Sequence, residues 1–237
     1  MPALIQPRQL MSQPMGLATI DWSNPINRGL VYLYSGRTGV VFPVDYQKLD
    51  LIGLCYSGAK RIAGKSGLSI DRLGGSVSYG NKFGRTKNID SGAGQTLFSL
   101  ASNKYSLPSR NRELSYQLGQ YETATCLAPR FGNGADGDVV YGYCSGAAEF
   151  GGSFTLLPGD NAIAVRQDTG VEQALFVNGV KDPIVSTSKT EPFYGELYAG
   201  QSLAKSPVYV AAVWSRALTD SEICSLSANP WQIFPAA

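Results

Sequence analysis

The 237-residue sequence contains no histidine. Histidine is the usual general base near neutral pH and the commonest metal ligand, so its absence excludes Ser-His-Asp and Cys-His hydrolases. The four cysteines have no C-x-x-C spacing, and no histidine is present to complete a mixed zinc site. We therefore expect no structural zinc. We expect Cys55, Cys126, Cys144 and Cys224 to be reduced core residues, with disulfides as the minor alternative.

Charged residues are also scarce, at 16% of the chain, and the net charge is only +2 with no run of Lys or Arg. The sequence therefore lacks the basic patch that is typical of nucleic-acid-binding proteins. No apolar run is long enough to cross a bilayer, and the N-terminus has no signal-peptide pattern. We expect neither nucleic acid nor a membrane as partner, and we expect synthesis and folding in the cytoplasm.

The sequence also lacks two carboxylates on one face of a strand. Such a pair would permit glycan hydrolysis without histidine. The nearest pair, Asp136 and Asp138, lies in a Gly-rich stretch that predicts a turn, and Glu191 and Glu196 share no predictable face. Asn133 joins the two aspartates in offering oxygen ligands for calcium, but the spacing does not match a twelve-residue calcium loop. We expect no enzyme activity, no catalytic residue, no cofactor and no metal.

Short apolar runs punctuated by glycine and proline fill most of the chain. They are rich in β-branched and aromatic residues, no helical periodicity separates them, and they predict two packed antiparallel sheets. The predicted strands lie near residues 29–34, 39–44, 67–72, 75–79, 95–101, 113–120, 138–143, 152–157, 161–167, 172–178, 193–199 and 207–214.

The segment from Pro207 to Pro230 is the most specific of the sequence, because a strand runs directly into a short helix. Thr219 and Glu222 have the spacing of a capping box, and Leu218 and Ile223 stand at the staple positions beside it, which predicts a helix over residues 219–227. Both faces of the preceding strand are apolar, so it should be an inner strand with the helix as one cover. The two predicted faces are Val208, Val210, Ala212 and Trp214 on one side and Tyr209, Ala211 and Val213 on the other. After the helix, we expect the side chains of Trp231 and Phe234 to cover the edge of the sheet below the helix. The alternative is that they bind a neighbouring subunit.

Residues 1–28 differ from the rest, because they contain four prolines and no sustained periodicity. We divide the chain into an extended Pro-rich arm, residues 1–28, and one sandwich domain, residues 29–237. The arm carries more apolar residues than a solvated linker, so it should cover a surface of its own domain or of a neighbouring subunit. The partner-binding candidates in the arm are Leu4, Ile5, Leu10 and Met11.

Three stretches resemble laminin-G-like, concanavalin-A-like jelly rolls. They are the hairpin Gly64 to Tyr79, the hairpin Ala162 to Gly179 ending in Val-Asn-Gly, and the strand and capped helix after Pro207. The resemblance implies an all-β, two-sheet antiparallel jelly-roll sandwich with one short C-terminal helix.

The arm, the jelly roll and the Asn-Pro-Trp-Gln-x-Phe end together resemble bacteriophage proteins of this superfamily. That resemblance implies a virion structural protein, foremost a capsid decoration or cement protein that binds other virion proteins or neighbouring copies of itself as a homo-oligomer. The alternative is a tail-fibre or host-surface glycan-binding module with a glycan partner, and the third reading is a degenerate glycan hydrolase.

Overall fold

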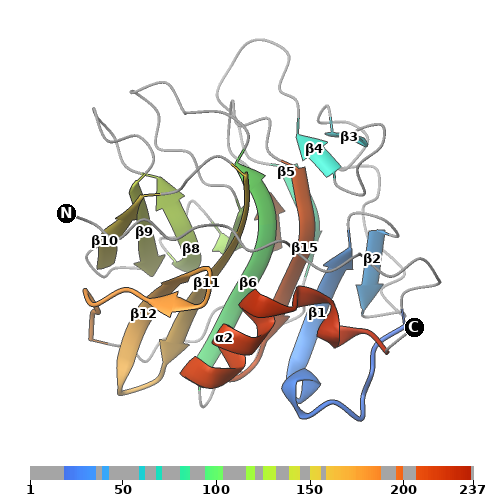
Figure 1. Ribbon diagram of the computed structural model, residues 1–237. Helices are drawn as coiled ribbons and strands as arrows, with labels where there is room; N and C mark the ends of the chain where they lie inside the picture. The colour runs from blue at the N-terminus through green and yellow to red at the C-terminus, as the bar shows by residue number, and fades with distance from the viewer. Residues whose placement is uncertain are drawn as a thin grey trace.

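The computed structural model describes residues 19–35, 39–42, 59–61, 68–70, 81–85, 94–103, 116–120, 125–131, 139–144, 150–155, 159–187, 196–199 and 207–235. These residues form two antiparallel β-sheets, with an α-helix on a face of the larger one (Figure 1). The prediction of an all-β sandwich with a short C-terminal helix is therefore confirmed. The boundary drawn at residue 28 stays a prediction, and residues 1–18 of the arm lie outside the described part.

The larger sheet has the strand order β13-β12-β11-β6-β15-β1-β2, with β4 pairing with β15 and β3 pairing with β4. Its strands are β1 (Leu30–Ser35), β2 (Gly39–Phe42), β3 (Ala59–Arg61), β4 (Leu68–Ile70), β6 (Gly94–Asn103), β11 (Gly159–Asp168), β12 (Glu172–Val177), β13 (Val180–Lys181) and β15 (Pro207–Trp214).

The smaller sheet has the order β10-β9-β8-β7-β14-β5. Its strands are β5 (Asn81–Arg85), β7 (Tyr116–Gln120), β8 (Thr125–Phe131), β9 (Val139–Cys144), β10 (Phe150–Thr155) and β14 (Glu196–Ala199). The sheets meet where β11 contacts β8 and where β12 contacts β9 and β10.

Strand β15 is an inner strand between β6 and β1, as its two apolar faces predicted. Val210, Ala212 and Trp214 belong to the core cluster that α2 (Asp220–Ala228) covers. Tyr209 joins the same cluster although strict alternation places it on the opposite face. The reason is an irregularity in the pairing with β6 between Val208 and Val210, which resets the alternation at this point.

Helix α2 begins at the predicted capping box. The Glu222 amide donates to Thr219 Oγ1 at 3.2 Å, and the Thr219 amide donates to Glu222 Oε2 at 2.8 Å. Leu218 and Ile223, the two staple residues, are buried. Such a short helix is marginal by itself, so the burial of Ile223 and Leu226 in the core cluster fixes it on the sheet.

The chain after α2 closes the same core. The 3-10 helix η3 (Pro230–Ile233) buries Trp231 and Ile233, and Phe234 follows them into the cluster. The rings of Trp231 and Phe234 lie 6.4 Å apart between centroids. Both aromatic residues therefore contribute to the core of their own domain.

A buried carboxylate joins the edges of the two sheets. Asp182 follows β13 and accepts hydrogen bonds from the Ser153 amide and hydroxyl of β10, both at 2.9 Å. Gly151 in β10 has φ +83°, and a Cβ at this residue would lie 2.7 Å from Leu175 Cδ2. Only glycine fits this close approach of β10 to β12.

Four described strands were not predicted: β3, β5, β8 and β13. Pro129 in β8 lowers the strand propensity of an otherwise suitable run, and β13 has only two residues. One predicted strand, residues 75–79, lies outside the described residues. Cys224 is a free and exposed cysteine of α2, so the expectation that it fills the core is wrong.

Candidate functional site

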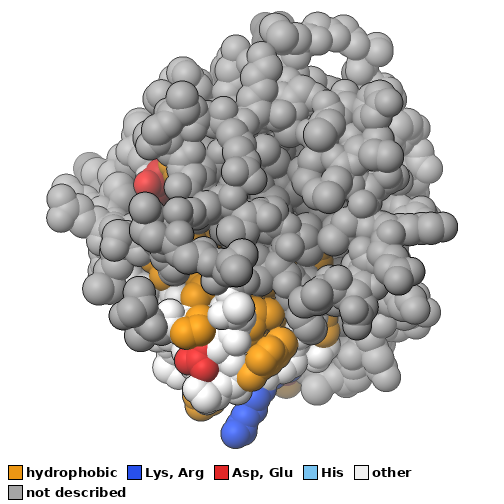
Figure 2. All heavy atoms as spheres, turned by 90° about the vertical axis from the view of Figure 1, so that its right-hand side faces the viewer, with side chains coloured by type: hydrophobic (Ala, Val, Ile, Leu, Met, Phe, Trp, Pro, Cys, Tyr) orange, Lys and Arg blue, Asp and Glu red, His pale blue; other side chains and the backbone are white. Residues whose placement is uncertain are grey.

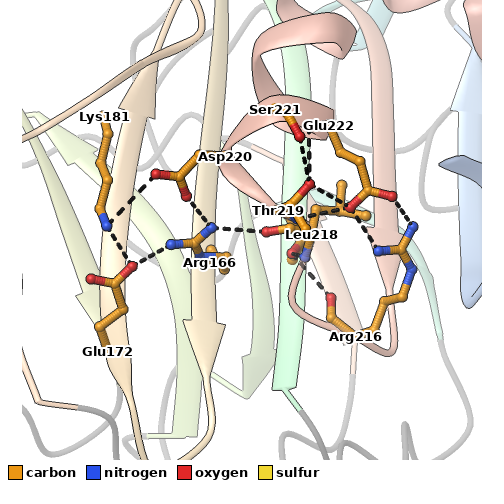
Figure 3. A network of polar contacts seen from close by, with 10 residues as sticks. Arg166, Glu172, Lys181, Arg216, Leu218, Thr219, Asp220, Ser221 and Glu222 are labelled. Carbon is orange, nitrogen blue, oxygen red and sulfur yellow. Dashed lines mark hydrogen bonds and ion pairs between the residues drawn. The ribbon is translucent and has the colours of Figure 1, made fainter.

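The largest charged cluster in the described part of the chain surrounds Arg166, near the C-terminal end of β11 (Figure 3). The guanidinium forms ion pairs with Glu172 of β12 and, at 2.5 Å, with Asp220 at the start of α2. Lys181 of β13 forms a second ion pair with Glu172 at 2.6 Å. The cluster therefore connects three adjacent strands with the helix N-terminus.

Arg166 lies on the face of β11 that α2 covers, in line with Ala162 and Ala164 of the core cluster. Its guanidinium stands 5.0 Å from the centre of the Phe176 ring, and its Nη1 also donates to the Leu218 carbonyl at 2.9 Å. Burial favours the neutral form of Glu172, but hydrogen bonds from Lys181 and Arg166 outweigh it and hold the pKa of Glu172 below its usual value. The charges of the cluster are thus paired with one another, and we interpret the cluster as the junction that fixes α2 to the sheet.

A second charged pair connects α2 to the N-terminal segment. Arg216 forms an ion pair with Glu222 at 2.6 Å, and its Nε donates to the Arg28 carbonyl at 2.7 Å. The Arg216 hydrogen bond lowers the pKa of Glu222. Glu222 also accepts the hydrogen bond from the Thr219 amide in the capping box. The same carboxylate therefore caps the helix and holds Arg216, which contacts the Arg28 carbonyl.

Residues 19–28 lie on the C-terminal segment of the chain. The Asp21 amide donates to the Ile233 carbonyl at 3.0 Å, and Asn24 Nδ2 donates to the Gln232 carbonyl at 2.9 Å. Trp214 Nε1 donates to the carbonyl of Ile26, which is itself buried. This part of the predicted arm therefore packs against its own domain.

Trp22 is the exposed large hydrophobic residue of this segment. Its side chain is 56% exposed, whereas Trp214 and Trp231 are 0% and 8% exposed. Figure 2 shows the side of the molecule that carries β1 and β2 in Figure 1, where described hydrophobic side chains gather beside acidic and basic ones.

The residues singled out from the sequence as sites lie elsewhere. The partner-binding candidates Leu4, Ile5, Leu10 and Met11 are outside the described residues, and so are Asn133, Asp136 and Asp138. Among the residues that the structure describes, no group of three or more His, Cys, Asp or Glu side chains is placed to hold a metal ion. In the same residues, no helix combines the length and the apolar character needed to cross a membrane.

No family model matches the chain, and no curated protein sequence matches it. Solved structures do match. Trypanosoma rangeli sialidase is 13% identical, with a TM-score of 0.54 over 88% of this chain and 34% of the sialidase. The same sialidase in complex with sialic acid is 16% identical, with a TM-score of 0.56 over 88% and 34% of the two chains. A mutant of this sialidase displaying trans-sialidase activity is 15% identical, with a TM-score of 0.56 over 89% of this chain and 34% of the mutant.

These matches show a shared jelly-roll or concanavalin-like β fold. Our chain spans about a third of the length of the sialidase structures. Nothing in the comparisons points to a virion protein.

The expectation that the chain is not an enzyme is contradicted, because solved structures that share its fold include sialidases. The sequence argument required a histidine base or two carboxylates on one strand. The absence of those motifs therefore did not justify the exclusion of enzyme activity.

Proposed function

We propose that this chain is a carbohydrate-binding β-sandwich. The observation that carries the proposal is the fold likeness to a sialidase that has been solved in complex with sialic acid, at a TM-score of 0.56 over 88% of the chain. The comparisons favour this reading over capsid decoration, which we placed first from the sequence.

The test is binding of the full chain to an immobilised glycan array that contains sialylated, galactose-terminated and glucan ligands. We expect saturable binding to one ligand class, confirmed in solution by titration calorimetry. Release of the sugar from chromogenic glycosides, measured in parallel, separates binding from turnover. If the folded chain binds no glycan in either format and releases no sugar, the proposal fails.

A role in a virion is the second candidate, and the apolar, Pro-rich composition of residues 1–18 favours it. An extended segment of this kind loses little entropy on docking. Leu4, Ile5, Leu10 and Met11 would then bind a capsid or tail subunit or a second copy of the chain. Deleting residues 1–18 should abolish incorporation into particles, as measured by the copy number in purified particles; incorporation at full occupancy without them would contradict this candidate.

A further inference from the structure

The turn between β12 and β13 consists of Asn178 and Gly179, an Asn-Gly pair. Asn178 has φ +51° and Gly179 has φ +84°, the positive values that a tight hairpin turn requires and that this pair of residues adopts most readily. The same pair is chemically reactive. Because glycine has no Cβ, its backbone nitrogen is unhindered and can attack the carbonyl carbon of the preceding asparagine side chain.

This attack converts the side-chain amide of the asparagine into a carboxylate. The Gly179 nitrogen loses its proton and forms a bond to Asn178 Cγ, and Nδ2 takes up the proton and leaves as ammonia, which closes a cyclic imide. Water then opens the imide at either of its carbonyl carbons. The product is aspartate or, where the backbone now runs through the former side chain, isoaspartate. Water is the only co-reactant.

In the folded chain, both ends of the Asn178 side-chain amide are bound to β11. Oδ1 accepts from the Ala162 amide at 2.8 Å, and Nδ2 donates to Asn161 Oδ1 at 3.0 Å. The backbone amide of Asn178 also donates to the Ala162 carbonyl, at 2.7 Å. Loss of Nδ2 as ammonia breaks the bond to Asn161, and rotation of the side chain onto the glycine nitrogen breaks the bond to Ala162. The fold therefore opposes the reaction.

Helix α2 restrains the same turn from a second side. A Cβ at Gly179 would lie 3.2 Å from Cys224 Cα and 3.2 Å from Ser227 Cβ, so the glycine lies directly against the helix. The strands on either side of the turn are paired with each other, Val177 with Val180. Reaction at Asn178 thus requires the hairpin to move away from β11 and α2.

We propose that Asn178 is a deamidation site gated by the fold, which the closed turn protects and each local opening of the β12–β13 hairpin exposes to irreversible conversion. The product weakens the hairpin that forms it. A carboxylate at residue 178 has no proton to donate to Asn161 Oδ1, and isoaspartate lengthens the backbone of the turn that sets the pairing of Val177 with Val180. The site acts independently of any glycan.

The test compares the rate of conversion in the folded and the unfolded full-length chain. The wild-type protein is incubated at mildly alkaline pH with and without denaturing guanidinium chloride. Trypsin then releases residues 167–181 as one peptide, because it cuts after Arg166 and Lys181, and mass spectrometry measures the converted fraction. Since only the open population reacts, the rate without denaturant should be lower by a factor of at least about ten.

The second Asn-Gly pair of the sequence, Asn133 and Gly134, is the chemical reference in the same sample. In denaturant it should convert at a rate similar to that of Asn178. If Asn178 converted equally fast with and without denaturant, the gate would be wrong. If it did not convert in denaturant while Asn133 did, it would not be a modification site.

Two variants separate local opening from global unfolding. Asn161→Ala removes the acceptor of Asn178 Nδ2 and should raise the rate in the folded chain several-fold, with no change in denaturant. Asn24→Ala is the matched control, because it removes a side-chain amide that donates to the Gln232 carbonyl instead, and it should keep the wild-type rate. Equal acceleration by both variants would show that global unfolding exposes the site. The wild-type comparison decides the gate even if Asn161→Ala does not fold.

The converted chain carries an additional negative charge, so ion exchange separates it from the unconverted chain. We expect its denaturation midpoint to be lower than that of the unconverted chain. Equal midpoints would contradict the claim that conversion weakens the hairpin.

Discussion

At the scale of single residues, Thr219 and Leu218 contribute to α2 in different ways. Thr219→Ala removes the hydroxyl that accepts from the Glu222 amide, and loss of such a cap costs about 1 kcal/mol. Leu218→Ala removes a buried core side chain and should cost more, about 2–5 kcal/mol. Urea denaturation measures both. Thr219→Ser keeps the hydroxyl and serves as control; an unchanged midpoint for Thr219→Ala would refute the role of the capping box.

Glu222 makes stability depend on pH. Its pKa in the folded protein lies below the ordinary value of 4.5, chiefly because Arg216 donates a hydrogen bond to it. A carboxyl group with a lowered folded pKa stabilises the protein fully above its unfolded pKa, and this contribution is lost as the pH falls through the folded pKa. Glu222→Gln should therefore lose less stability than the wild type between pH 6 and pH 3. Equal losses for the two proteins in denaturation titrations would contradict this assignment.

At the scale of elements, Arg166 fixes α2 to β11 and β12. Arg166→Met keeps an apolar stem near Phe176 but leaves Glu172 with Lys181 as its partner, so we expect a loss of about 3 kcal/mol. Asp220→Asn is the matched variant at the exposed end of the cluster. The Asp220 side chain is 58% exposed, and the expected loss is below about 1 kcal/mol. Similar losses for the two variants in chemical denaturation would show that burial does not set the strength of this cluster.

The elements also show what the sequence could predict. The capped helix was predicted to within one residue, because the cap of Thr219 and Glu222 is a contact between neighbours in the chain. Arg166 was not predicted as the centre of a charged cluster, since Asp220 lies 54 residues further along the chain. An arginine within an apolar strand was the available signal. Strand β8 was missed for a related reason, because it pairs with β7 and β9 despite Pro129, and the sequence around it does not show these partners.

At the scale of the whole molecule, the surface position of Trp22 depends on how two distant segments meet. The sequence placed Trp22 among the apolar residues of an arm that needs a surface to cover. Its neighbour Ile20 does pack against the core cluster, while Trp22 itself points outward. Composition alone does not distinguish the two, since the difference arises from the contacts of Asp21 and Asn24 with the C-terminal segment.

The same contacts predict how the chain tolerates truncation. A chain that begins at residue 19 keeps the contacts of residues 19–28 with the C-terminal segment and is the reference for the unfolding midpoint in urea. Removal of residues 1–28 takes away the buried Ile26 and the carbonyl that accepts from Trp214 Nε1, and should cost about 3 kcal/mol or more. The fluorescence of the buried Trp214 reports both outcomes. If the shorter chain were as stable as the longer one, the domain would begin near residue 29, and residues 19–28 would only lie on its surface.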